Sequence, residues 1–258
     1  MDFCAKLAAM AVKYNIKFSD KQLENLTCYY EILKARDYIQ NADTAIRIII
    51  DCLACYDPTV FPVGCRIVDV GTGTGFPGLL LKILRPDVEI CLLDWSNKRL
   101  PLLREVVDRL GLSGVTVVHA WAEDAGQCRE HREQYQVALS RGIPSSLTVL
   151  LELCLPLVCP GGYYIAFKSE NYQEQVAAAA ARTVMLGGEL VKTKSVQLTN
   201  QDNSQAFIYI KKVRSTPTEY PRSCLCNYVE TVEEQQALVR RLRNLAECLP
   251  DRSSKYTY

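Results

Sequence analysis

Apolar residues recur at helical spacing through the first part of the chain. Residues 3–10 and 23–33 each carry one apolar stripe, and residues 45–55 form a further, largely buried helical pattern. Ser19 or Asp20 is a suitable cap for the second of these helices. We therefore predict an N-terminal helical prefix that packs on the rest of the protein and covers its substrate side.

From residue 66 onward, strand patterns alternate with helical ones. Strands are predicted at 66–70, 89–93, 115–119, 136–140 and 162–167, and helices at 97–110, 146–157 and about 173–186. Two more strand patterns, 189–198 and 205–212, follow without a helix between them, which indicates an antiparallel hairpin. The order predicts a Rossmann-like α/β fold: a mostly parallel, seven-stranded sheet closed by that hairpin.

These patterns divide the chain into three parts. We predict a helical prefix over residues 1–60, a core over 61–215 and a tail over 216–258. In the tail, Leu238, Leu242, Leu245 and Leu249 share one stripe of an amphipathic helix. Such a helix docks on the core or binds a partner, and the sequence leaves both open.

Residues 66–78, RIVDVGTGTGFPG, connect the first strand to a helix through a glycine turn. Gly71, Gly73 and Gly75 allow a tight turn and let a ligand approach the backbone closely. Pro77 suits the first turn of a helix, where free amide groups can face a polar ligand. The carboxyl ends of parallel strands are where such sheets bind their cofactors, so this stretch predicts a nucleotide-cofactor site.

Two cofactor classes fit this turn. Residues 73–78 satisfy the G-x-G-x-x-G spacing of dinucleotide-binding proteins. A glycine turn that binds no cofactor is a further alternative. Asp69, however, is a carboxylate where dinucleotide enzymes carry something small and apolar. The D-x-G-x-G-x-G pattern resembles motif I of S-adenosylmethionine (AdoMet) methyltransferases, whose cofactor offers an amino group and a sulfonium to a carboxylate. Asp94 ends the next strand and is placed for ribose hydroxyls in either class. The closing hairpin also favours methyltransferases over nicotinamide-dependent oxidoreductases.

Composition and charge limit the partners, metals and cellular location that the protein can have. The chain has 258 residues and a formal net charge of +1, so any nucleic-acid contact needs a local basic patch. Its twelve cysteines do not follow the disulfide pattern of a small secreted domain. No histidine lies at ligand spacing from a cysteine pair to complete a zinc site, so no metal is predicted. Without an N-terminal leader pattern or a long apolar run, we expect a cytoplasmic protein with no membrane contact.

Several separated motifs carry a family resemblance. They are VDVGTGTGFPG at 68–78, LLDWSNKR at 92–99, AED at 122–124, LSR at 139–141, PGG at 160–162 and TPTEYPR at 216–222. In this order they resemble ribosomal RNA small subunit methyltransferase G, also called glucose-inhibited division protein B, over residues 15–222. The resemblance implies a class I AdoMet-dependent methyltransferase. It also implies cofactor contacts by Gly71 and Phe76, by Ala122 and Glu123 at the adenine, and by Arg141 between cofactor and substrate.

The family's reaction transfers the methyl group of AdoMet to N7 of a guanine in 16S rRNA. Guanine N7 has an exposed lone pair and no proton to lose, so the reaction needs positioning more than a general base, and we assign no catalytic residue. The implied partner is 16S rRNA or the small ribosomal subunit, and we expect a monomer. Arg141 is predicted to contact the guanine edge or a phosphate, the alternative being an ion pair at the strand end.

Other residues are weaker candidates for RNA contact. Basic side chains cluster at Lys98, Arg99 and Arg104, and again at Lys211, Lys212, Arg214 and Arg222; a solvated surface is the alternative for each. Trp95 and Trp121 adjoin the cofactor motifs, where an indole either stacks on a base or packs in the core.

The chain also departs from the family pattern. Trp121 replaces an Arg, Ile48 replaces a His, Gln205 falls near a usual Arg, and residues 35–41 lack the usual Trp-Asn. Because these departures lie on the substrate side, two alternatives stay open: a non-catalytic AdoMet-binding paralogue associated with ribosome or RNA, and a methyltransferase with a different RNA substrate.

Overall fold

The computed structural model describes residues 2–168, 172–197 and 204–222. The chain divides into two compact units, Met1–Pro221 and Arg222–Tyr258, and the architecture below is that of the first. The leucine stripe predicted between residues 238 and 249 lies outside the described residues.

Eight α-helices and seven strands are found in the described part of the chain. The helices are α1 (Phe3–Lys13), α2 (Asp20–Lys34), α3 (Ala42–Leu53), α4 (Gly78–Leu84), α5 (Leu100–Leu110), α6 (Ala122–Gln127), α7 (Leu147–Cys154) and α8 (Tyr172–Met185). The strands are β1 (Arg66–Val70), β2 (Glu89–Asp94), β3 (Val115–His119), β4 (Tyr135–Ser140), β5 (Val158–Lys168), β6 (Gly188–Gln197) and β7 (Ser204–Lys212). None of the helices described is both long and apolar enough to cross a bilayer.

The strands form one sheet in the order β3-β2-β1-β4-β5-β7-β6. Strands β3, β2, β1, β4 and β5 pair in parallel, while β7 is antiparallel to both β5 and β6. The predicted seven-stranded sheet and its closing hairpin are therefore confirmed. The order reverses between β1 and β4, and open α/β sheets bind their ligands at the carboxyl ends of the strands flanking such a reversal.

Local signals explain most element boundaries. Ser19 caps α2 as predicted: its hydroxyl accepts from the Gln22 amide at 3.3 Å, and the Gln22 side chain accepts from the Ser19 amide at 2.8 Å. Helix α5 begins at Leu100, later than the predicted residue 97. A separate turn after β2, in which the Ser96 amide donates to Asp94, precedes it, and a proline lies in the first turn of the helix. Helix α6 was not predicted, since six residues are too few to show a helical period.

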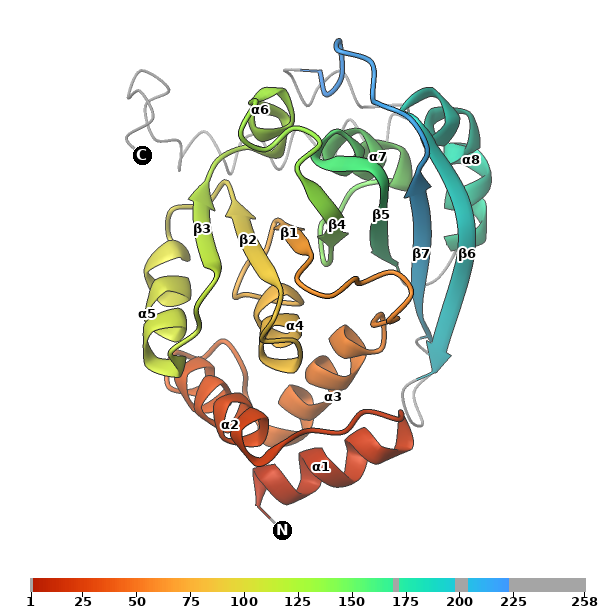
Figure 1. The fold of residues 1–258 in the computed structure, drawn as a ribbon. Helices are drawn as coiled ribbons and strands as arrows, with labels where there is room; N and C mark the ends of the chain where they lie inside the picture. Colours follow the sequence, from red (N-terminus) through yellow and green to blue (C-terminus); the bar gives the residue numbers. More distant parts are fainter. Residues whose placement is uncertain (1, 169–171, 198–203, 223–258) are drawn as a thin grey trace. The chain divides into compact units, whose positions relative to one another are not determined.

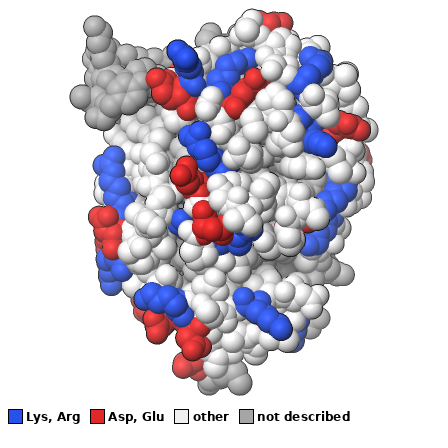
Figure 2. Space-filling view, in the orientation of Figure 1, with Lys and Arg blue, Asp and Glu red and all other residues white. Residues whose placement is uncertain are grey.

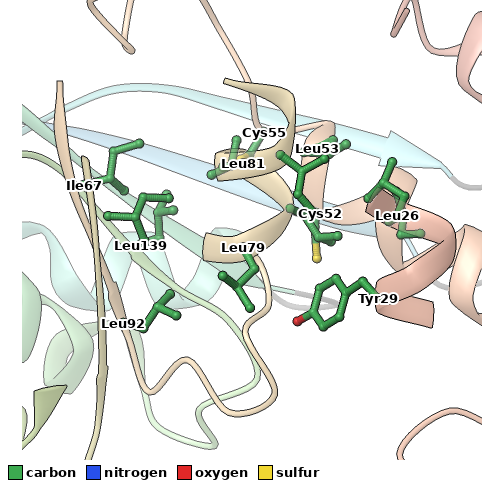
Figure 3. Packing of buried hydrophobic residues seen from close by; sticks show 14 of the residues in the cluster. Leu26, Tyr29, Cys52, Leu53, Cys55, Ile67, Leu79, Leu81, Leu92 and Leu139 are labelled. Atoms are coloured by element: carbon green, nitrogen blue, oxygen red, sulfur yellow. The ribbon is translucent and has the colours of Figure 1, made fainter. Parts of the chain in front are cut away.

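Helices cover both faces of the sheet. Figure 1 shows α1–α5 gathered on one side of the strands and α6–α8 on the other. Helix α4 lies between the sheet and the pair α2 and α3, and Figure 3 shows its apolar side chains between those of the strands and those of the prefix. The side chains that meet there include Leu26, Tyr29, Cys52, Leu53, Ile67, Leu79, Leu81, Leu92 and Leu139. Burial of each large apolar side chain contributes roughly 1.5–3 kcal/mol, so this contact holds α2 and α3 firmly beside the glycine turn.

The segment after β7 is tied back to the core. The Arg132 guanidinium donates to the carbonyls of Gly126 and Tyr220, both at 2.7 Å, and to that of Thr216 at 2.8 Å. Lys212 is fully buried, and its ammonium donates to the Leu155 carbonyl at 2.6 Å. The interpretation of Lys212 as an RNA-contact residue is therefore wrong, because a side chain inside the protein cannot reach a phosphate.

Candidate active site

The glycine turn after β1 has the conformation that its sequence requires. Gly71, Gly73 and Gly75 have φ angles of +68°, +62° and +101°, a region that L side chains rarely adopt. A Cβ on Gly75 would lie 2.5 Å from both Leu79 Cδ1 and the Tyr29 hydroxyl. Glycine is needed there both for its dihedral angles and for space.

Asp69 lies at the carboxyl end of β1 and is completely buried. Its Oδ2 accepts hydrogen bonds from the Thr72 hydroxyl at 2.7 Å and from the Gly78 amide at 2.8 Å. Its Oδ1 is buried without a hydrogen-bond partner. Burial raises the pKa of Asp69 to about 7, against the lowering effect of those two hydrogen bonds. A buried carboxylate with one unsatisfied oxygen is a fitting counter-charge for a cationic ligand group such as an ammonium.

Asp94, at the end of the neighbouring strand β2, organises the turn itself. Its Oδ2 accepts from the Gly73 amide and its Oδ1 from the Ser96 amide, each at 2.8 Å. The carboxylate thus links the glycine turn of β1 to the loop after β2. Its predicted contact with ribose hydroxyls stays a prediction, which its remaining acceptor capacity permits.

Helix α2 reaches the same turn from the prefix. The Tyr29 hydroxyl donates to the Thr74 carbonyl, and its ring centroid lies 5.4 Å from that of Phe76. Burial raises the pKa of Tyr29 well above its usual value, so the phenol stays a neutral donor. Tyr29 therefore holds the turn in place, a role that its position in an apolar stripe did not reveal.

The other candidate cofactor residues lie where α6 begins, after β3. Ala122 and Glu123 are both buried in its first turn. Directly before them, the ring of Trp121 stacks on that of Trp95, with centroids 5.2 Å apart and planes 13° from parallel. The two indoles, which the sequence placed beside the cofactor motifs, thus pair with each other across the carboxyl ends of β2 and β3.

Arg141 follows β4 directly, on the other side of β1. Its Nη2 lies 3.3 Å from Asp51 Oδ2, and Asp51 lies near the C-terminal end of α3. The ion pair at the strand end, given above as the alternative to a contact with guanine or phosphate, is therefore present, and its partner comes from the helical prefix. Asp51 was not among the predicted site residues, although a carboxylate within an otherwise buried helical pattern was the signal for it.

Two of the residues that depart from the family pattern make contacts within the protein. Ile48 is partly buried against the apolar core, and Gln205 donates from its side-chain amide to the Lys168 carbonyl at 2.9 Å. On the face drawn in Figure 2, basic and acidic side chains are interspersed without one large basic field. Among the described residues, no group of His, Cys, Asp or Glu is arranged to hold a metal ion.

Comparison with protein families decides the assignment. The model of the GidB family, rRNA small subunit methyltransferase G, matches residues 24–204. The chain belongs to this family. The resemblance, the AdoMet-dependent rRNA methyltransferase activity and the AdoMet cofactor are thereby confirmed, and the nicotinamide-dependent alternative is excluded.

Relatives named ribosomal RNA small subunit methyltransferase G match most of the chain. That of Desulforamulus reducens is 40% identical, covering 71% of this chain and 76% of its own. That of Alkaliphilus oremlandii is 39% identical, covering 81% and 90%, and that of Clostridium botulinum is 32% identical, covering 86% and 95%. Among solved structures, TrmN from Thermus thermophilus aligns with a TM-score of 0.45 at 22% identity, covering 58% of this chain and 45% of that one. An rRNA methylase from Streptococcus thermophilus aligns with a TM-score of 0.47 at 14% identity, covering 60% and 91%.

Proposed function

We propose that the protein transfers the methyl group of AdoMet to N7 of a guanine in the 16S rRNA of the small ribosomal subunit. The observation that carries this proposal is the placement of Asp69 and the glycine turn beside Arg141, in a chain of this family. Strands β1 and β4 are adjacent, so the cofactor residues after β1 and the arginine after β4 share one edge of the sheet.

We assign the described residues different roles toward the cofactor and the base, according to their positions at the edge of the sheet. AdoMet, when bound, supplies an electrophilic methyl group on a sulfonium. The buried Asp69 would serve as counter-charge for its cationic amino-acid end, Asp94 would face the ribose, and the first turn of α6 would face the adenine edge. Arg141 faces the base that accepts the methyl group. No side chain has to remove a proton, because guanine N7 attacks with a free lone pair; alignment lowers the barrier instead.

The test is transfer of labelled methyl from AdoMet to small subunits and to rRNA lacking the modification, followed by separation of the product nucleosides. Label in 7-methylguanosine supports the proposal. Label in another nucleoside indicates a different target in RNA. Bound AdoMet without transfer to either substrate identifies a non-catalytic paralogue.

A matched pair of variants places the cofactor. Gly73→Asp adds a carboxylate inside the glycine turn beside Asp94, and we expect it to abolish AdoMet binding and transfer. Gly111→Asp is the control, because Gly111 has nearly the same φ, +61° against +62°, and nothing lies within 4 Å of its Cβ position. Retained AdoMet binding in Gly73→Asp would exclude the glycine turn as the cofactor site.

We further propose that the protein works as a monomer in the cytoplasm, where its ribosomal substrate is found. Each chain carries one complete set of the candidate site residues, so transfer needs no second copy. Light scattering of the full chain during turnover tests this, and activity confined to a dimer fraction contradicts it.

A further inference from the structure

The helical prefix supplies a charged group to the substrate end of the sheet. Asp51 lies on α3, and its Oδ2 is 3.3 Å from Nη2 of Arg141, which directly follows β4. Both side chains are largely buried, with exposed fractions of 10% for Asp51 and 27% for Arg141. Within the described residues, the Asp51 carboxylate is the hydrogen-bond partner recorded for this guanidinium, so the pair connects α3 to the edge where substrate is handled.

Arg141 needs such an anchor. It begins the loop after β4, and the next residue, Gly142, has a φ of +69°, which L side chains rarely adopt. A long side chain on a loop loses conformational entropy when it is held in one rotamer. An ion pair formed before substrate binds has already paid that entropic cost, so substrate binding does not include it. The guanidinium has five N–H donors, so one bond to Asp51 leaves others for a ligand.

The Arg141 guanidinium interacts electrostatically with two buried acids. Asp51 Oδ1 and Asp69 Oδ1 are both buried without hydrogen-bond partners, and the charge of Arg141 acts on both carboxylates. Burial raises the pKa of Asp51, while Arg141 opposes that rise. Asp51 is therefore the acid that contacts the guanidinium, at 3.3 Å, while Asp69 acts on it only through its charge.

Guanine offers two acceptors on the edge that carries N7, namely N7 itself and O6. N7 has to stay free, because its lone pair attacks the methyl group, so O6 is the atom left for a guanidinium donor. Adenine carries an N6 amino group at that place, which a guanidinium repels. An arginine held in a fixed direction at this site thus selects guanine and leaves N7 exposed.

We propose that Asp51 is a positioning residue that fixes the Arg141 guanidinium for guanine O6. The inference rests on the proposed function and adds to it the role of the helical prefix: α3 sets the direction of the base-reading arginine. Contact of Arg141 with an RNA phosphate is the competing arrangement.

The experiment compares Asp51→Asn with Asp43→Asn. Asp43 is on the same helix and forms an exposed ion pair with Lys6 at 3.2 Å, so the control removes a similar charge far from Arg141. We measure kcat and KM for small subunits, the AdoMet dissociation constant and the melting temperature. For Asp51→Asn we expect kcat to fall about 10- to 100-fold, with AdoMet binding changed less than about threefold and the fold retained. Asp43→Asn is expected to match the wild type.

A double-mutant cycle with Arg141→Gln shows whether Asp51 acts through Arg141. We expect Asp51→Asn combined with Arg141→Gln to be no slower than Arg141→Gln alone, because the anchor has no function once the guanidinium is gone. Additive losses in kcat overturn the positioning role.

The remaining outcomes separate the alternatives. Wild-type kcat in Asp51→Asn overturns this inference and leaves the proposed function intact. If the wild type makes no 7-methylguanosine, both the proposed function and this inference are refuted. An increase confined to KM, with a weaker salt dependence in Arg141→Gln, assigns Arg141 to a phosphate and overturns the contact with O6.

Discussion

Asp69→Asn provides a direct test of the electrostatics at the proposed cofactor site. Asn has the shape of Asp, keeps an oxygen to accept from Thr72 and Gly78, and removes the charge. In the wild type, burial raises the pKa of this carboxyl from 3.8 to about 7. We expect the variant to be more stable than the wild type at neutral pH and above, and to bind AdoMet poorly.

The magnitude follows from linkage between protonation and folding. The folded carboxyl holds its proton up to about pH 7, whereas in the unfolded chain it is lost near 3.8. Wild-type stability from this group therefore falls as pH rises between those values, by about 4 kcal/mol in total at 1.36 kcal/mol per pH unit. The Asn side chain does not titrate, but its buried amide nitrogen lacks a partner and costs about 1–3 kcal/mol. The variant is then more stable by roughly 1–3 kcal/mol at pH 8, and no more stable than the wild type at pH 5.

Urea unfolding of both proteins without AdoMet, at several pH values between 5 and 8, measures this difference. The wild type should lose about 3 kcal/mol relative to the variant across that range. Asp108→Asn is a control at an exposed position of α5. Titration calorimetry should show AdoMet binding at least about 10-fold weaker in Asp69→Asn, since a charged hydrogen bond contributes about 1.5–3 kcal/mol. Parallel stability curves for variant and wild type between pH 5 and 8 would refute the argument from burial.

Three further predictions concern packing around the site. Gly75→Ala should lower stability by about 2–4 kcal/mol in thermal unfolding, because its Cβ would lie 2.5 Å from the Tyr29 hydroxyl at a φ of +101°; an unchanged melting temperature would contradict the crowding. Lys212→Met should lower stability by about 1–3 kcal/mol in urea unfolding, because the Leu155 carbonyl loses the buried ammonium that donates to it. Lys211→Met should cost little, and equal losses in the two variants would show that burial is not the cause. The chain's two tryptophans stack beside the predicted adenine position, so AdoMet should change their fluorescence at a saturating concentration, and a flat titration with binding shown by calorimetry would place the adenine elsewhere.

Local sequence patterns were sufficient for most of the fold. The β-branched run at residues 66–70, the glycine turn after it and the cap at Ser19 each depend on neighbours within a few residues, so the sequence predicts them directly. The two final strands without a helix between them also indicate the closing hairpin. Helix α6 was not predicted, because its six residues are too few to show a helical period.

The sequence by itself determined the class of fold, and it predicts the cofactor turn and the acid beside it, because the dihedral angles of a glycine turn and the ends of strands depend on residues close together in the chain. Only the tertiary structure decided the partners of those groups. Asp51 meets Arg141 because β4 pairs with β1 while α3 packs over α4, and Trp95 meets Trp121 because β2 lies beside β3. Likewise, the burial that raises the pKa of Asp69 comes from the elements packed around it. Such contacts join residues far apart in the chain, and their energies depend on the exclusion of water, which no local pattern encodes.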